Sequence, residues 1–78
     1  MRHTIKMPKL GDAMQDVVIE VWEVEVGARV EVGDSLMTVE TDKVNTEVPS
    51  PVAGELVERL VSEGDEVLVG APIAVINS

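Results

Sequence analysis

The sequence contains no cysteine, phenylalanine or tyrosine, and its 78 residues include one tryptophan. Without cysteine the chain has no disulfide, no thiolate nucleophile and no sulfur ligand for a metal, so packing alone must stabilise the fold. Because aromatic side chains are nearly absent, valine and other aliphatic residues must fill the core, and β-branched residues favour strands. The composition therefore predicts a small all-β domain and is compatible with a reducing compartment.

Basic residues are also scarce. Six Lys and Arg residues stand against fifteen Asp and Glu residues, which gives a net charge of −9. This charge repels nucleic acid and anionic membranes and argues against both as partners. Residues 1–6 lack the apolar run of a secretion signal, and no segment reaches the length of a membrane span. We expect one domain over residues 1–78, monomeric in isolation and cytoplasmic, or in the mitochondrial matrix of a eukaryote.

The strand pattern between residues 17 and 26 changes phase. The apolar positions are first Val17, Ile19 and Val21, and then Trp22, Val24 and Val26. A shift of one residue moves the buried side to the other face, which predicts a β-bulge or a strand that crosses between sheets, with Trp22 in the core. Residues 36–39 and 44–48 are typical of two further strands, with residues 40–43 as the turn between them.

The chain repeats itself at an offset of 37 residues. The pattern Gly-x-x-Val-x-Val-Gly occurs at residues 27–33 and again at 64–70. The spacing within residues 55–61 would also fit a helix, but the repeat aligns them with the strand around Val24, so we predict a strand. One half alone would leave an apolar sheet face bare. We therefore predict two similar antiparallel sheets packed face to face with quasi-twofold symmetry, and glycines with positive φ among positions 27, 33, 54, 64 and 70.

The symmetry has two consequences for the first half. The turn at Lys43 and the chain termini should lie at opposite ends of the domain. Met7-Pro8 lies twenty residues before the repeated glycine, whereas Val48-Pro49 lies sixteen before it, which leaves four extra residues within Gly11–Asp16. This stretch predicts an enlarged loop, and enlarged loops on a compact scaffold often carry function.

Side chains for catalysis are few. His3 is the only histidine and lies near the terminus, where a plain surface or strand residue is expected. Residues 63–66 form an acidic turn that is typical of a solvated surface. Trp22 is expected in the core, and Met14 is expected to pack the enlarged loop onto the barrel. We predict no catalytic and no metal-binding residues.

Lys43 is the remaining candidate. An isolated lysine in a polar turn is usually a solvated surface residue. This lysine, however, follows Asp42 at the tip of a predicted tight hairpin and is the only basic residue between Arg29 and Arg59. A long primary amine on a rigid turn is well suited to covalent attachment, because a modifying enzyme can reach it and the attached group can swing freely.

These residues carry a resemblance to a known family. Glu40-Thr41-Asp42-Lys43-Val44, the run from Glu47 to Gly54, Met7-Pro8-Lys9-Leu10-Gly11 and Val32-Gly33-Asp34 together resemble the lipoyl domain of the dihydrolipoamide acyltransferase component of 2-oxo acid dehydrogenase complexes. The resemblance covers almost the whole chain. It implies a flattened barrel of two four-stranded antiparallel sheets, with lipoic acid amide-linked to Lys43 at a hairpin tip.

The resemblance also implies partners. A thiamine-diphosphate-dependent decarboxylase, an acyltransferase domain and a flavin-dependent dihydrolipoyl dehydrogenase would use the lipoyl group, and a lipoate ligase or lipoyl transferase would attach it. Asp42 and Val44 would flank the lysine for recognition by the ligase. In the family the enlarged loop lies beside the lipoyl turn and helps the decarboxylase to recognise its own domain. The loop residues here are Gly11, Asp12, Ala13, Met14, Gln15 and Asp16.

Two alternative readings stay open at this point. Biotin carriers share the fold but have methionines on both sides of the lysine, where this sequence has Asp42 and Val44. Lipoyl-like barrels also occur unmodified as structural modules, although such a scaffold has no need of an Asp-Lys turn. The sequence also leaves open which substrate the complex would use, since complexes for pyruvate, 2-oxoglutarate, branched-chain acids and acetoin-type substrates all have domains of this kind.

Overall fold

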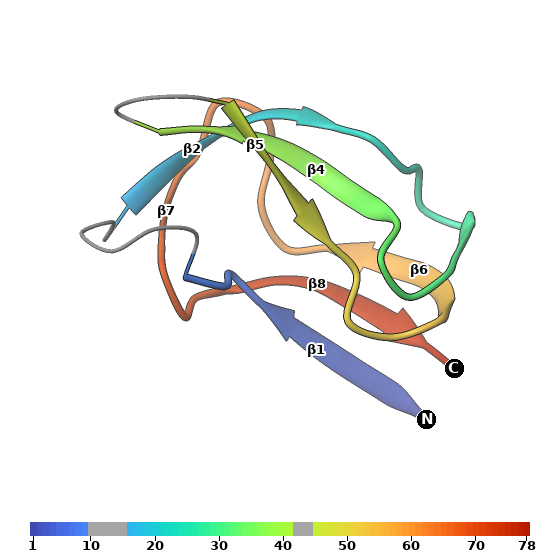
Figure 1. The fold of residues 1–78 in the computed structure, drawn as a ribbon. Coiled ribbons are helices and arrows are strands. Elements are labelled where there is room, and N and C mark those ends of the chain that lie inside the picture. Colours follow the sequence, from blue (N-terminus) through green and yellow to red (C-terminus); the bar gives the residue numbers. More distant parts are fainter. Residues whose placement is uncertain (10–15, 42–44) are drawn as a thin grey trace.

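A computed structural model describes residues 1–9, 16–41 and 45–78, which form strands joined by turns (Figure 1). Among these residues, no helix has the length and apolar composition that a membrane span requires. The strands are β1 (Arg2–Lys6), β2 (Asp16–Trp22), β3 (Arg29–Val30), β4 (Ser35–Glu40), β5 (Asn45–Pro49), β6 (Gly54–Arg59), β7 (Glu66–Leu68) and β8 (Pro72–Asn77).

The strands form two four-stranded antiparallel sheets, as predicted. The terminal sheet has the order β1-β8-β6-β3, and the hairpin sheet has the order β5-β4-β2-β7. Figure 1 shows them as two layers, with the hairpin sheet above and the terminal sheet below. Each sheet takes two strands from each half of the chain, so neither half can form a sheet without the other.

Hydrogen bonds in the two halves confirm the quasi-twofold symmetry. The amide of Gly27 donates to the carbonyl of Leu56, and the amide of Gly64 donates to the carbonyl of Ile19, both at 2.7 Å. Each residue of the first bond lies 37 residues from its counterpart in the second. The prediction that glycines with positive φ occur among positions 27, 33, 54, 64 and 70 is confirmed, since all five have positive φ.

Aliphatic side chains fill the space between the sheets. Trp22 joins them with 8% of its surface exposed, as predicted, and its Nε1 donates to the carbonyl of Val61 at 3.2 Å. The Arg59 guanidinium lies 5.0 Å from the centre of the indole ring and covers it from outside. The other buried apolar residues are Ile5, Met7, Val17, Ile19, Val30, Leu36, Met37, Val39, Val48, Leu56, Val67, Ile73, Ala74 and Ile76.

The phase change predicted in the second strand is a β-bulge. The pairing of β2 with β4 shifts register between Ile19 and Val21, so Glu20 is the extra residue. The bulge comes before Val21, which therefore turns outward and is 38% exposed. The predicted alternation placed Val21 on the buried face and continued the strand pattern to Val26, and both points were wrong: β2 ends at Trp22, and Val26 is 56% exposed. A matching bulge interrupts β6 between Leu56 and Glu58.

The predicted excess of four residues in the first half was also wrong. The amide of Gly70 donates to the carbonyl of Met7, and the amide of Gly33 donates to the carbonyl of Ser50, both at 2.8 Å. Met7 is thus the counterpart of Ser50, and Pro8 of Pro51, whereas the sequence comparison matched Pro8 with Pro49. Between this position and the repeated glycine, the first half is therefore longer by six residues. Hydrogen-bond register, and not the nearest proline, determines which residues of the two halves are equivalent.

The two termini lie side by side at one end of the barrel. The Met1 ammonium donates to the carbonyl oxygen of Ser78 at 2.9 Å, and Nε2 of His3 lies 2.8 Å from the Ser78 hydroxyl oxygen. His3 is thus the half-exposed strand residue that the sequence predicts. The end of β4 and the start of β5 lie at the other end of the barrel (Figure 1).

Candidate functional site

The predicted attachment turn and most of the predicted recognition loop lie outside the described residues. The described residues next to the attachment turn are Thr41 and Asn45, and those next to residues 10–15 are Lys9 and Asp16. The predicted site residues outside the description are Asp42, Lys43, Val44, Gly11, Asp12, Ala13, Met14 and Gln15.

The strands on either side of the predicted attachment turn are hydrogen-bonded neighbours. β4 pairs with β5 in antiparallel register as far as Glu40 and Asn45. Residues 41–44 thus connect two adjacent antiparallel strands, which is the arrangement of a β-hairpin. The pairing of β4 with β5 confirms the two strands of the predicted hairpin. The residues before and after residues 42–44 therefore lie at the same end of the hairpin sheet.

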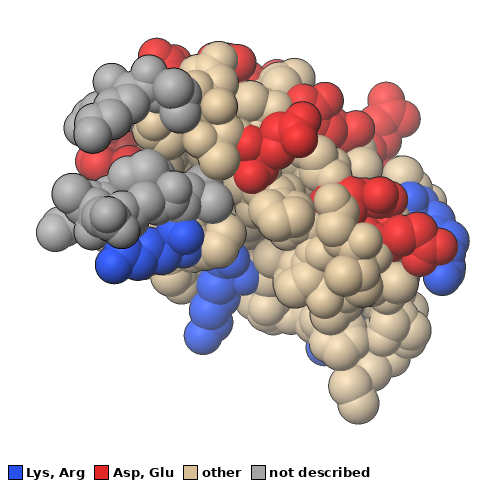
Figure 2. Space-filling view, viewed as in Figure 1, with Lys and Arg blue, Asp and Glu red and all other residues tan. Residues whose placement is uncertain are grey.

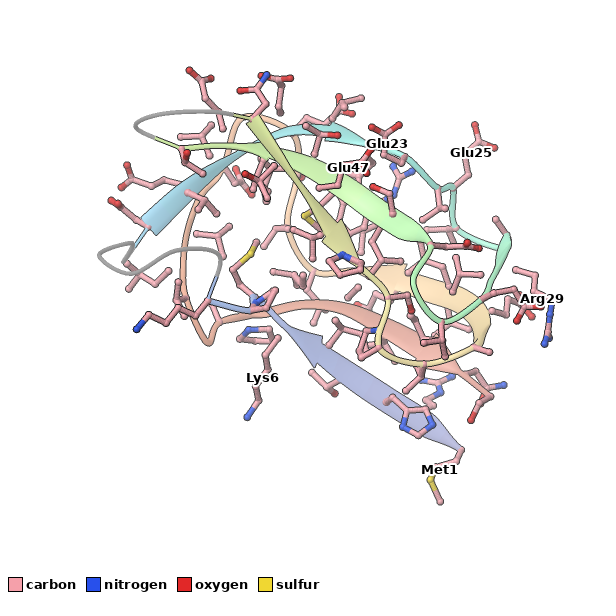
Figure 3. All side chains as sticks on the ribbon, in the orientation of Figure 1. Met1, Lys6, Glu23, Glu25, Arg29 and Glu47 are labelled. Carbon is pink, nitrogen blue, oxygen red and sulfur yellow. The ribbon has the colours of Figure 1, made fainter. Side chains whose placement is uncertain are left out.

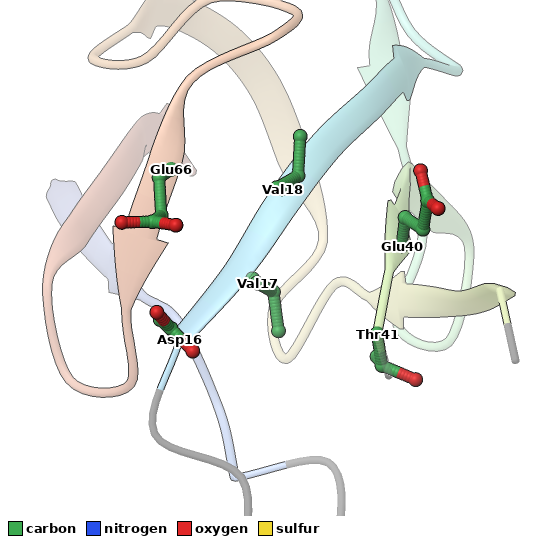
Figure 4. Close-up of a pocket in the computed structure, with 6 residues that line it drawn as sticks. All are labelled: Asp16, Val17, Val18, Glu40, Thr41 and Glu66. Carbon is green, nitrogen blue, oxygen red and sulfur yellow. The ribbon is translucent and has the colours of Figure 1, made fainter. Parts of the chain in front are cut away.

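A depression of about 260 Å³ lies beside this end of the hairpin sheet (Figure 4). Val18 pairs with Glu40 on one side and with Glu66 on the other, so three strands contribute to its walls. Asp16 was predicted in the enlarged loop, but it is the first residue of β2 and pairs with Leu68. The depression brings it to the same end as Thr41, which precedes residues 42–44. The borders of the two predicted functional segments are therefore neighbours. The depression is lined by Asp16, Val17, Val18, Glu40, Thr41 and Glu66.

Acidic side chains gather on the hairpin sheet. Its strands carry no lysine or arginine, whereas the strands of the terminal sheet carry most of the basic residues in the described part of the chain. Figure 2 shows the acidic residues over the upper part of the molecule, and in Figure 3 Glu23 and Glu47 project upward and Lys6 downward. The acidic residues of the hairpin-sheet strands are Asp16, Glu20, Glu40, Glu47 and Glu66.

The quasi-twofold symmetry shows that the fold does not require these carboxylates. At the same positions in the other half, Glu40 corresponds to Asn77 and Glu66 to Arg29. One end of the barrel is therefore acidic and its structural counterpart is not. The repeat does not predict this asymmetry, because it aligns the residues that the two halves share and not those that differ.

Two side-chain hydrogen bonds cross the outer face of the hairpin sheet. The Asn45 amide Nδ2 donates to Glu20 Oε1 at 3.1 Å, and the Thr38 hydroxyl donates to Glu23 Oε2 at 2.7 Å. They join β5 and β4 to β2 and the residue that follows it. Neither pair was predicted from the sequence, because the partners are 25 and 15 residues apart and meet only in the sheet.

The described residues hold no metal-binding cluster. Within residues 1–9, 16–41 and 45–78, no group of three or more His, Cys, Asp or Glu side chains is placed to bind a metal ion. His3 lies at the end of the barrel with the termini, away from the depression. What these residues form is a rigid two-sheet scaffold that borders the two predicted functional segments at one end.

Comparisons with known proteins agree with this arrangement. The family model described as "Biotin-requiring enzyme" matches residues 3–76. Over 70 residues the chain is 51% identical to the dihydrolipoyllysine-residue acetyltransferase component of the pyruvate dehydrogenase complex of Corynebacterium glutamicum. These 70 residues are 90% of this chain and 10% of that protein. It is 38% identical over 78 residues to the dihydrolipoyllysine-residue succinyltransferase component of the 2-oxoglutarate dehydrogenase complex of Bartonella vinsonii, covering 100% of this chain and 19% of that one.

A solved structure is similar over nearly its whole length. It is the lipoyl domain of the 2-oxoglutarate dehydrogenase complex of Azotobacter vinelandii, with a TM-score of 0.74, 29% sequence identity, and coverage of 96% of this chain and 95% of that one. The chain thus matches nearly all of that lipoyl domain but spans no more than a fifth of the length of the curated relatives above. It belongs to the biotin/lipoyl attachment family and is a lipoyl domain of the kind found in the acyltransferase components of 2-oxo acid dehydrogenase complexes.

Proposed function

We propose that this lipoyl domain carries lipoic acid on Lys43 and shuttles acyl groups and electrons between the active sites of a 2-oxo acid dehydrogenase complex. The observation that carries the proposal is the β4–β5 hairpin. Its last strand pair, Glu40 with Asn45, brackets the Asp-Lys sequence at the end of the barrel opposite the termini.

The attachment requires an amine that a modifying enzyme can reach. An amide forms when Nζ of Lys43 bonds to the carbonyl carbon of an activated lipoyl group, the activating group leaves with its bonding electrons, and the proton passes from nitrogen to a base of the ligase. The bound lipoyl group then supplies a disulfide that accepts an acyl group and two electrons. This domain would hold and present the group, and the partner enzymes would carry out the chemistry.

The position of the termini supports a carrier role. Met1 and Ser78 lie together, so the neighbouring parts of a longer chain would leave from the end opposite the hairpin. A tether at that end leaves the lysine free to face other proteins. Tethering raises the effective concentration of the carried group at each active site, to the millimolar range for short flexible linkers.

Partner recognition would use the second segment. We propose that a thiamine-diphosphate-dependent decarboxylase contacts residues 11–16, and that the ligase, the acyltransferase domain and dihydrolipoyl dehydrogenase contact the lysine turn with Asp42 and Val44. The support is that Asp16 and Thr41 line the same depression, so one partner surface can reach the borders of both segments. Decarboxylases that serve different oxo acids could then distinguish domains whose lysine turns are alike.

An intact-mass measurement tests the proposal. After coexpression with a lipoate ligase and added lipoate, the domain should gain the mass of one lipoyl group, and Lys43→Arg should gain none. Lys43→Arg should keep the parent's melting temperature, since exposed substitutions usually change stability by about 0.5 kcal/mol or less. Lipoylation of Lys43→Arg would refute the assignment of the lysine. Efficient biotinylation of the parent by a biotin ligase would favour a biotin carrier instead.

A further inference from the structure

The side chain of Asn45 reaches across a whole strand. Asn45 is the first residue of β5 and stands two positions after Lys43. Its Nδ2 donates to Oε1 of Glu20 at 3.1 Å, although β4 lies between β5 and β2 in the hairpin sheet. A carboxylate can only accept hydrogen bonds, so the amide nitrogen of Asn45 must face it. The bond ties the start of β5 to the third strand of the sheet.

The bulge in β2 explains how Glu20 reaches so far. Glu40 pairs with Asn45 on one side and with Val18 on the other, so these three residues form one row across the sheet. Glu20 is the extra residue between Ile19 and Val21 and has no pair in β4. A bulge redirects the side chain of its extra residue. Here it directs the carboxylate along the outer face toward the row that ends at Asn45.

The other half of the fold provides an internal comparison. Arg2 pairs with Asn77 as Asn45 pairs with Glu40, so Arg2 is the counterpart of Asn45. The bulged residue of β6 is Val57, which has no group that could form the bond. The end of the barrel that holds the termini therefore folds without such a pair. The pair is present at the end where the hairpin bears the lysine.

We infer that Glu20 and Asn45 are positioning residues that fix the direction in which the chain leaves residues 42–44, and that this raises the affinity of modifying and acylating enzymes for the lysine turn. The inference rests on the proposed function. If only one orientation of the turn fits a partner, the apparent dissociation constant is the intrinsic value divided by the fraction of domains in that orientation. Loss of the bond lowers that fraction, so KM should rise while kcat stays unchanged.

The test exchanges donor and acceptor. Asn45→Asp keeps the shape of the side chain but removes the donor and sets two carboxylates against each other, so the KM of the domain for lipoate ligase should rise by about threefold or more. In the double variant Glu20→Gln/Asn45→Asp, the Gln amide can donate to the new carboxylate, and KM should return to the parent's value. Glu20→Gln alone keeps an acceptor oxygen and should behave like the parent.

A matched control lies on the same face. The Thr38 hydroxyl donates to Glu23 at 2.7 Å, and Thr38 pairs with Glu47, two residues further along β5 than Asn45. Thr38→Val removes a side-chain bond of similar exposure that lies farther from the lysine turn. Its KM should equal that of the parent. An equal rise in KM for Thr38→Val and Asn45→Asp would overturn the inference, because it would indicate a general weakening of the sheet.

A second measurement does not depend on lipoate. NMR order parameters of the backbone amides at Asn45 and Thr46 should fall in unmodified Asn45→Asp and recover in the double variant. If the parent is lipoylated but Asn45→Asp keeps its KM, the positioning role is wrong and the proposed function stands. If the parent takes no lipoate, the proposed function fails, and unchanged order parameters in Asn45→Asp would then refute the restraint itself.

Discussion

Among the glycines in the described part of the chain, Gly54 should be the most costly to replace by alanine. Gly54 begins β6 and lies between Val30 of β3 and the end of β8. A Cβ at this position would be 2.5 Å from the carbonyl oxygen of Asn77 and 2.9 Å from Cγ2 of Ile76. The side chain of Ile76 is fully buried, and a backbone oxygen cannot rotate away without breaking the sheet, so two strands must separate.

The expected loss can be estimated from overpacking. Extra methyl groups in a tight core cost about 1–3 kcal/mol, and the contact with backbone puts Gly54→Ala near the upper limit of about 3 kcal/mol. A domain of this size loses about 4–8 °C in melting temperature for each kcal/mol. The midpoint of Gly54→Ala should therefore be at least about 12 °C lower than that of the parent, and lipoylation should fall with the folded fraction.

Gly27→Ala is the matched control. Gly27 has φ of 96° and no heavy atom within 4 Å of a Cβ placed there, so its alanine variant suffers only backbone strain. That strain costs about 1 kcal/mol, or roughly 4–8 °C. Urea denaturation followed by circular dichroism gives both unfolding free energies. If the two variants differ by less than about 0.5 kcal/mol, the close approach at Gly54 does not determine stability and the reasoning fails.

Three further outcomes are expected. Replacing both Asp42 and Val44 by methionine should raise biotinylation by a biotin ligase and lower lipoylation, as measured by intact mass, because the flanking residues would then match those of biotin carriers. Deletion of residues 12–15 should leave lipoylation nearly normal but lower the initial rate of reductive acylation by the cognate decarboxylase about tenfold, or roughly 1.4 kcal/mol; an unchanged rate with a parental melting curve would exclude a recognition role. Trp22→Phe removes the indole donor to the carbonyl of Val61 and should lower the free energy of unfolding by about 1 kcal/mol.

Local patterns in the sequence predict strands, and they select Lys43 as the candidate for attachment. The valine-rich alternation identifies strands, and the glycines of the 37-residue repeat have the positive φ expected of them. The repeat also decides between helix and strand for β6, because its counterpart lies in a clear strand. The Asp-Lys turn needs no knowledge of the fold, since residue types at short spacing define it. These features depend on neighbours in the chain, which a sequence displays directly.

The tertiary structure alone decided how the elements combine. The repeat predicts two similar sheets, but only hydrogen bonding assigns two strands of each half to each sheet. Hydrogen bonding also shows that Met7 is the counterpart of Ser50. The bulge at Glu20, and not the hydrophobic pattern, turns Val21 outward. Register is set by pairing with distant strands, and a shift of one residue moves side chains to the other face of the sheet.

The asymmetry of charge and the bond between Glu20 and Asn45 belong to the same class of information. The sequence determines that the domain is acidic, and only the arrangement of strands places the carboxylates on the hairpin sheet and the arginines and lysines mainly on the other. The two partners are 25 residues apart and lie on strands that are not neighbours. They meet across β4, where the bulge in β2 redirects the side chain of Glu20.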